Sequence, residues 1–146
     1  MRYLAIDYGT KRTGVAICDP SETIVSPLAV IEGQKNLLDR IVRFVETENV
    51  GAVVLGLPLN MDDSVGPQAK LVFGFAEQLK ERLSIPIHFQ DERLTSFAAE
   101  QKSAHLKSAK KKKQRPLDAV AAAEILEAFL ENKARQSSNE PRSYPQ

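Results

Sequence analysis

The N-terminal part of the chain shows the alternating apolar pattern of β-strands. Residues 2–7 and 13–19 form two such segments, and the polar residues 8–12 between them contain a glycine and suit a hairpin turn. Residues 23–31 form a third segment of the same kind. The pattern therefore predicts three consecutive antiparallel strands.

Helical spacing begins after these strands. From Asn36 onward apolar residues recur every three to four positions, which predicts a helix with Asn36 as its N-cap. The continuous apolar residues 51–57 predict a central strand that is covered on both faces. A second helix is predicted over residues 67–83, with Phe73 on its buried side, and a further short strand over residues 86–90.

The C-terminal part is predicted to be helical and then disordered. One helix is expected over residues 95–105 and the last over residues 116–132, whereas residues 133–146 lack an apolar pattern. We therefore expect one domain, residues 1–132, and a disordered tail, residues 133–146. The order of elements predicts an α/β fold with a mixed five-stranded sheet, antiparallel first and parallel afterwards, flanked by helices.

Composition and charge limit the function only weakly. The chain has 146 residues, 42% of them hydrophobic, which is enough for one buried core, and its formal net charge is only +1. The one cysteine, Cys18, lies in an apolar segment and is expected to act as a small buried hydrophobe. No apolar segment reaches the roughly 18 residues of a membrane span and no signal sequence is seen, so we expect a cytoplasmic protein with no membrane partner.

Acidic residues follow elements whose ends should meet at one edge of the predicted sheet. Asp7 ends the first strand, Asp91 and Glu92 end the last strand, and Asp118 lies in the first turn of the last helix, on its apolar side. Ligands bind where the carboxyl ends of parallel strands and the first turns of helices converge. These carboxylates are therefore candidates for a shared site.

Each acidic residue also has a purely structural interpretation. Asp118 could stabilise the helix N-terminus, and Asp7 could hold the amides of the hairpin turn. Asp91 and Glu92 could form a surface ion pair with Arg93. Each of these interpretations is plausible alone, but all of them would have to coincide at one edge of the sheet.

Carboxylates in this arrangement favour phosphodiester hydrolysis with divalent metals. Hard carboxylate oxygens hold two Mg²⁺ or Mn²⁺ ions roughly 4 Å apart, one of which activates water while the other stabilises the leaving oxygen. The two histidines, His88 and His105, are isolated in the sequence, and packed or solvated roles are expected for them.

A strongly basic segment precedes Asp118. Residues 101–117 contain no acidic residue. Their cations are Lys102, Lys107, Lys110, Lys111, Lys112, Lys113 and Arg115. The segment fits contact with a phosphate backbone beside the proposed metals, and a solvated charged loop is the competing interpretation. Residues 7–11 separately resemble the phosphate-binding hairpin of actin-like ATPases and sugar kinases, but the chain is too short for a complete kinase.

Four segments together resemble one bacterial family. They are AIDYGTKRTGVA (residues 5–16), VLGLPLNMD (54–62), DERLT (91–95) and LDAVAA (117–122). In order and spacing they resemble the YqgF-type proteins, a family of Holliday-junction resolvase-like proteins and pre-16S ribosomal RNA nucleases. The resemblance spans roughly residues 1–132.

The resemblance implies a ribonuclease H-like fold and assigns roles to residues in the matched segments. Asp7, Glu92 and Asp118 become the catalytic and metal-binding carboxylates, with Asp91 as the substitute for Glu92. Contacts with the substrate are expected from residues of the matched motifs and of the basic segment. These are Lys11, Asn60, Arg93, Lys110, Lys111, Lys112 and Lys113. Two positions depart from the family pattern: Asp63 stands where glycine is usual and Val65 where glutamate is frequent, which puts the shape of this loop in question.

The main hypothesis is a metal-dependent endonuclease that processes the 5′ side of pre-16S ribosomal RNA during ribosome biogenesis. Its partner is then structured RNA, including the assembling small ribosomal subunit. The alternatives are a Holliday-junction resolvase acting on branched DNA and a non-catalytic nucleic-acid-binding module in transcription. A resolvase is expected to dimerise whereas an RNA-trimming enzyme can act as a monomer, and the sequence does not decide between monomer and homodimer.

Overall fold

The computed structural model describes residues 1–92 and 117–139 and, within the second range, the side chains of residues 119–136. Its strands are β1 (Tyr3–Asp7), β2 (Arg12–Cys18), β3 (Val25–Glu32), β4 (Ala52–Leu57) and β5 (Ile87–Asp91). Its helices are α1 (Leu37–Thr47), α2 (Pro67–Arg82) and α4 (Leu117–Asn139). The helix expected over residues 95–105 lies outside the described residues.

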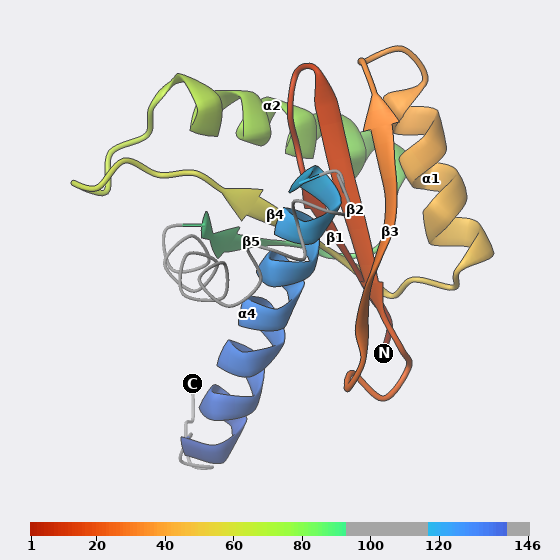
Figure 1. Ribbon diagram of the computed structural model, residues 1–146, viewed down its shortest axis with the longest axis vertical. Coiled ribbons are helices and arrows are strands. Elements are labelled where there is room, and N and C mark those ends of the chain that lie inside the picture. The colour runs from red at the N-terminus through yellow and green to blue at the C-terminus, as the bar shows by residue number, and fades with distance from the viewer. Residues whose placement is uncertain (93–116, 140–146) are drawn as a thin grey trace, which may run out of the picture.

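The five strands form one mixed sheet in the order β3-β2-β1-β4-β5 (Figure 1). β1, β2 and β3 pair in antiparallel fashion, β4 is parallel to β1, and β5 is parallel to β4. This arrangement confirms the predicted α/β class. Because β1, β4 and β5 run in the same direction, their last residues lie at one end of the sheet, which we call the carboxyl end.

Two hydrophobic clusters cover the two faces of the sheet. α1 and α2 pack on one face with Leu4 and Ile6 of β1, and α4 packs on the other with Tyr3 and Ala5 of the same strand. Side chains alternate between the faces along a strand. Asp7, two residues after Ala5, therefore belongs to the α4 face of the sheet.

Two details of the helices differ from the prediction. The buried aromatic residue of α2 is Phe75, whereas Phe73 is 37% exposed and packs edge-on against Phe89 of β5, with 5.2 Å between the ring centroids. Asn36 is the N-cap residue of α1, as predicted, but it adopts a left-handed conformation (φ 67°) and makes no side-chain capping hydrogen bond. The helical spacing of apolar residues alone does not determine which of Phe73 and Phe75 faces the sheet.

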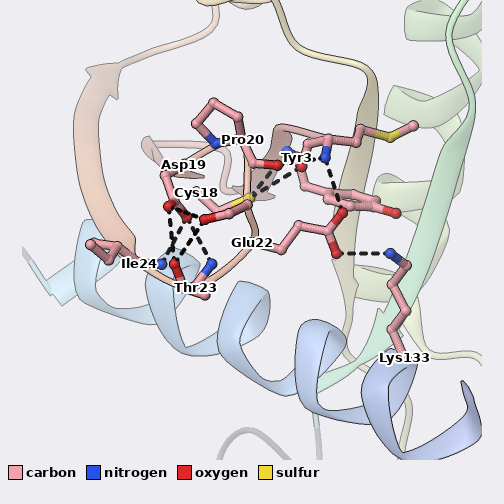
Figure 2. Close-up of polar contacts among 10 residues, drawn as sticks. Tyr3, Cys18, Asp19, Pro20, Glu22, Thr23, Ile24 and Lys133 are labelled. Atoms are coloured by element: carbon pink, nitrogen blue, oxygen red, sulfur yellow. Dashed lines mark hydrogen bonds and ion pairs between the residues drawn. The ribbon is translucent and has the colours of Figure 1, made fainter. Parts of the chain in front are cut away.

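The last helix is longer than predicted. α4 continues past Asn132 to Asn139, so residues 133–139 are helical and the expected disorder does not apply to them. Lys133 Nζ lies 2.8 Å from Glu22 Oε1 and 5.3 Å from the centre of the Tyr3 ring (Figure 2). These two contacts tie this part of α4 to the sheet. Residues 140–146 lie outside the described residues.

The expectations about Cys18 and about membrane-spanning segments can be compared with the structure. Cys18 is 1% exposed and its sulfur accepts a hydrogen bond from the Tyr3 amide, which agrees with a buried structural thiol. Burial also raises the pKa of the Cys18 thiol, which disfavours the reactive thiolate. In residues 1–92 and 117–139, none of the helices has the length and apolar character that a membrane span requires.

The turn between β2 and β3 is organised around the Asp19 carboxylate (Figure 2). Asp19 accepts hydrogen bonds from the amides of Ile24 (2.8 Å) and Thr23 (2.7 Å) and from the Ser21 hydroxyl (2.7 Å). These bonds stabilise the charged form, so they hold the pKa of Asp19 far below its ordinary value.

We expect Asp19→Asn to lower the melting temperature at pH 7, with a difference from the wild type that narrows as the pH falls. A carboxyl whose pKa is lowered by folding stabilises the protein above its unfolded pKa, about 3.9, and loses that contribution as the pH falls through its folded pKa. Thermal unfolding at pH 7, 4 and 3 measures this effect. A melting-temperature difference that stays constant over this range would contradict it.

Candidate functional site

Asp7 and Glu92 meet at the carboxyl end of the sheet. Asp7 is the last residue of β1 and Glu92 directly follows β5. Gly56 of β4 follows Leu55, the partner of Ile6, and the Glu92 side chain lies against Gly56. The side chains of Asp7 and Glu92 are joined by a hydrogen bond. The structure thus brings together two acidic residues that lie 85 positions apart in the sequence.

Strand alternation distinguishes Glu92 from Asp91. In β5 the His88 ring contacts Phe129 of α4, whereas the Phe89 ring contacts a residue of α2 on the opposite face. By the two-residue period Glu92 lies on the His88 face, which is also the face of Asp7, and Asp91 lies on the other. Glu92 is therefore the acidic residue of this pair that reaches Asp7.

The environment of Glu92 is unfavourable for a free negative charge. Burial raises the pKa of the Glu92 carboxyl, the neighbouring charge of Asp91 raises it further, and the hydrogen bond with Asp7 opposes the rise. Two carboxyls in hydrogen-bond contact share a proton when no cation lies between them. A divalent cation takes the place of that proton, so the pair fits a site for a hard metal ion.

Gly56 makes room for this carboxyl. A Cβ atom on Gly56 would lie within 3.0 Å of both the Glu92 side chain and Ile125 Cδ1 of α4, and no ordinary contact is that short. The absence of a side chain at position 56 lets Glu92 turn inward beneath α4. This role of Gly56 was not predicted from the sequence, although an isolated glycine in a strand is a signal of close approach.

The first turn of α4 lies near the same end of the sheet. Ile125 packs beside Gly56 near the end of β4, and Phe129 contacts Tyr3 near the start of β1, so α4 runs opposite to β1. Asp118 lies in the first turn of α4, seven residues or about two turns before Ile125. Its side chain is outside the described atoms. Within residues 1–92 and 117–139, three or more potential metal ligands do not converge at any one point.

The turn between β1 and β2 depends on its glycine and on a buried threonine. A Cβ atom on Gly9 would overlap the carbonyl oxygen of Arg12. Thr13, fully buried, donates its hydroxyl proton to Gly9 O (3.2 Å) and accepts from Gly9 N (3.3 Å). This turn presents Lys11 as an exposed residue four positions after Asp7.

Asn60 shapes the loop between β4 and α2. Its side-chain amide donates to the Ser64 hydroxyl (2.9 Å), and its backbone amide donates to the Ser64 carbonyl (3.0 Å). The Ser64 hydroxyl in turn donates to the Asp62 carboxylate (2.6 Å). Asn60 therefore has a structural role in the loop, and its contact with substrate stays a prediction.

Asp63 occupies a backbone conformation that favours glycine. Its φ angle is +73°, at the position where the YqgF-type sequences usually have glycine. The loop therefore keeps a left-handed residue in spite of the substitution. Val65, the second departure, is 43% exposed and adds no carboxylate to the site.

We expect Asp63→Gly to be tolerated and Asp63→Val to destabilise the protein by about 1–2 kcal/mol. A β-branched side chain clashes with the backbone at positive φ, whereas glycine does not. Chemical denaturation of the two variants measures the difference. Equal stability of the two variants would show that the loop changes shape to accommodate valine.

The other predicted substrate contacts, Arg93 and Lys110–Lys113, lie outside the described residues, as does His105. His88 packs among aromatic rings, 5.3 Å from Phe129 and 6.3 Å from Tyr3, which agrees with a packed histidine. Among the predicted site residues that are described, Asp7 and Glu92 are therefore the two whose side chains the structure brings into contact.

Comparison with known proteins places the whole domain in one family. The sequence model described as "RuvX: Holliday junction resolvase" matches residues 1–132. A "Putative pre-16S rRNA nuclease" of Roseiflexus sp. (strain RS-1) is 41% identical over 133 residues, which cover 90% of this chain and 94% of that protein. A protein of the same name from Chloroflexus aurantiacus (strain ATCC 29366 / DSM 635 / J-10-fl) is 45% identical over 139 residues, which cover 92% and 88%.

Two resolvases are among the solved structures that resemble this chain in fold. RuvC of T. thermophilus in complex with a Holliday junction substrate has a TM-score of 0.62 at 15% identity and covers 92% of this chain and 96% of that chain. Fowlpox virus resolvase with substrate Holliday junction DNA has a TM-score of 0.55 at 14% identity and covers 91% and 99%. At such identities the similarity concerns the fold alone, and it confirms the ribonuclease H-like architecture.

Proposed function

Because the chain belongs to the family described as "RuvX: Holliday junction resolvase", we propose that it is a metal-dependent nuclease that hydrolyses phosphodiester bonds in nucleic acids. The observation that carries the proposal is the hydrogen-bonded pair of Asp7 and Glu92 at the carboxyl end of the sheet. Relatives with 41% and 45% identity that bear the name of a pre-16S rRNA nuclease support it.

Three carboxylates would hold the metal ions, Mg²⁺ or Mn²⁺, in this proposal. Asp7 and Glu92 come from neighbouring parts of the sheet, and Asp118 comes from the first turn of α4. Bound divalent cations supply an activated water and stabilise the leaving oxygen. Asp7 would contribute its carboxylate to this site together with Glu92, with which it forms a hydrogen bond. A bound cation would favour the ionised form of the Glu92 carboxyl, whose pKa is raised by burial.

The substrate is proposed to be the precursor of 16S ribosomal RNA, cut on its 5′ side during ribosome biogenesis in the cytoplasm. The names of the relatives support RNA processing, whereas the junction-bound structures share only the fold. Exposed Lys11, together with Asn60, Arg93 and the basic residues Lys110–Lys113, is proposed to contact substrate phosphates. Hydrolysis of this kind would leave a 5′-phosphate and a 3′-hydroxyl, as the ribonuclease H-like fold of the family implies.

A cleavage assay tests this proposal. End-labelled ribosomal RNA precursor and a four-way DNA junction are incubated side by side with Mg²⁺ or Mn²⁺, and again with EDTA. We expect cleavage of the RNA that depends on metal and leaves a 5′-phosphate. Cleavage of the junction alone would replace the RNA-processing role with that of a resolvase.

Metal binding separates an enzyme from a non-catalytic binding module. We expect Mn²⁺ to raise the melting temperature of the wild type, because a ligand that binds only the folded state stabilises it, and we expect a smaller rise for Asp118→Asn. If Mn²⁺ has no effect on melting and neither nucleic acid is cut, the nuclease proposal is wrong and a binding module takes its place.

A further inference from the structure

Gln34 fixes the turn between β1 and β2 (residues 8–11). Its Nε2 donates to the carbonyl oxygens of Gly9 (3.0 Å) and Thr10 (3.1 Å), and its Oε1 accepts from the Tyr8 hydroxyl (2.9 Å). The two carbonyl oxygens can only accept, so the Gln34 amide group has to face them with its nitrogen. An exposed glutamine thus directs three hydrogen bonds to one turn, 24 to 26 residues away in sequence.

The remaining carbonyls of the turn are bonded as well. The Lys11 carbonyl accepts from the Gly33 amide (2.7 Å), and the Tyr8 carbonyl accepts from Gln68 Nε2 (3.3 Å) at the start of α2. The Tyr8 ring also stacks on Phe75 of α2, with 4.5 Å between ring centroids and 21° between the planes. All four carbonyls of residues 8–11 are therefore held by protein donors.

These bonds determine where the amide groups of the turn point. The carbonyl of Gly9 and the N–H of Thr10 belong to one trans peptide group and point in opposite directions, and the same holds for the carbonyl of Thr10 and the N–H of Lys11. Because both carbonyls point at Gln34, both N–H groups point away from it. Neither N–H donates to an acceptor within the part of the chain that the structure describes.

We propose that this turn is a phosphate-binding site, formed by the N–H groups of Thr10 and Lys11 with the Lys11 ammonium group, and that Gln34 positions it. Successive N–H groups that point the same way form an anion-binding concavity. The ligand is a phosphodiester of the nucleic-acid backbone next to the bond that is cut, so the inference rests on the proposed nuclease function. Thr10 is three residues from Asp7, at most about 10 Å along the chain.

Gln34 acts on substrate binding and not on the carboxylates. Asp7 is held independently of Gln34, because it pairs with Gly14 in the β1–β2 ladder. Loosening the turn therefore leaves the carboxyl pair in place while it disorders the two N–H groups. The expected signature is a rise in KM without a matching fall in kcat.

An NMR titration tests the site without relying on cleavage. A short RNA oligonucleotide is added to the ¹⁵N-labelled protein in the presence of EDTA, and the amide resonances of Thr10 and Lys11 are followed. We expect both to shift in the wild type and to shift much less in Gln34→Leu. Unmoved Thr10 and Lys11 amides at saturating RNA would overturn the proposal, even if the protein proves to be a nuclease.

Kinetics of Gln34 variants provide the second test. We expect Gln34→Leu, which removes all three hydrogen bonds, to raise KM about tenfold with kcat changed less than about twofold. Gln34→Glu keeps an acceptor for the Tyr8 hydroxyl but has no donor for the carbonyls, so it should behave like Gln34→Leu. Gln78→Leu is the matched control, because Gln78 borders the same surface groove as Gln34 and has no bond to the turn among those of residues 1–92 and 117–139.

The outcomes separate this inference from the proposed function. Shifted amides without any cleavage would leave the phosphate site in place and reject the nuclease. A fall in kcat with unchanged KM in Gln34→Leu would show that Gln34 acts through Asp7 and would contradict the proposal. An equal effect of Gln78→Leu would indicate a general disturbance of the groove and would also contradict it.

Discussion

Replacing Asp7 with asparagine should lower the rate of metal-dependent cleavage by about three orders of magnitude and leave the fold intact. Asp7 is a carboxylate of the proposed metal site, and it ends β1 and forms a hydrogen bond with Glu92. Asparagine keeps the size of the side chain and can still donate a hydrogen bond to Glu92, so the protein should fold. It removes the charge that a divalent cation needs. Initial rates of RNA cleavage at saturating Mn²⁺, with circular dichroism as the check of folding, measure the effect.

Asp91→Asn is the matched control for this prediction. It removes the same charge one residue before Glu92, but on the opposite face of β5, so its effect on the rate should be small. Asp91 also raises the pKa of Glu92, and removing it should allow the Glu92 carboxyl to ionise at lower pH. A cleavage rate in Asp7→Asn equal to that of Asp91→Asn would show that this carboxyl pair is not the metal site.

The strands and the mixed character of the sheet were predictable because the pattern that defines each strand is local. Alternating residues in β1 and β2 and the continuous apolar segment of β4 give the mixed sheet directly, and Asp7 is visible as the last residue of the first strand. The choice between Asp91 and Glu92 was not available from the pattern. It depends on the face to which each side chain points, and a shift of one residue at the end of a strand exchanges the faces.

The roles of residues whose contacts span long sequence separations could not be predicted from the sequence for a related reason. Gln34 is a polar residue in a connection, with no periodic pattern around it, and its partners are 24 to 26 positions earlier. Phe73 and Phe75 are equally apolar, and which of them is buried depends on the angle at which α2 packs on the sheet. The extension of α4 to Asn139 is made by a segment rich in polar residues, where Lys133 is held by contacts with distant Glu22 and Tyr3.

The second large effect is expected at Gly56, where a single methyl group should damage both the core and the site. In Gly56→Ala the new Cβ atom meets the Glu92 carboxyl on one side and Ile125 Cδ1 on the other. Overpacking of a filled core costs about 1–3 kcal/mol, and Ile125 is only 1% exposed. Displacing a catalytic carboxylate by about 1 Å is expected to cost about 100-fold in cleavage rate. Denaturant unfolding and initial rates measure the two effects separately.

A compensating substitution separates the two contacts. Ile125→Val removes the Cδ1 atom that the new methyl group meets, while it leaves the contact with Glu92 in place. We expect Gly56→Ala/Ile125→Val to be more stable than Gly56→Ala alone, although Ile125→Val by itself costs about 0.5–1.5 kcal/mol. The rate should stay low in the double variant, because the Glu92 carboxyl is still displaced.

Gly74 supplies the matched control for the methyl group itself. It lies within α2, and a Cβ atom there meets nothing within 4 Å. Gly74→Ala should therefore stabilise the protein by about 0.5–1 kcal/mol and leave the cleavage rate unchanged. If Gly56→Ala matched Gly74→Ala in both stability and rate, Glu92 would have room to move away from Gly56 without loss of function. The close approach at Gly56 would then contribute nothing to the geometry of the site.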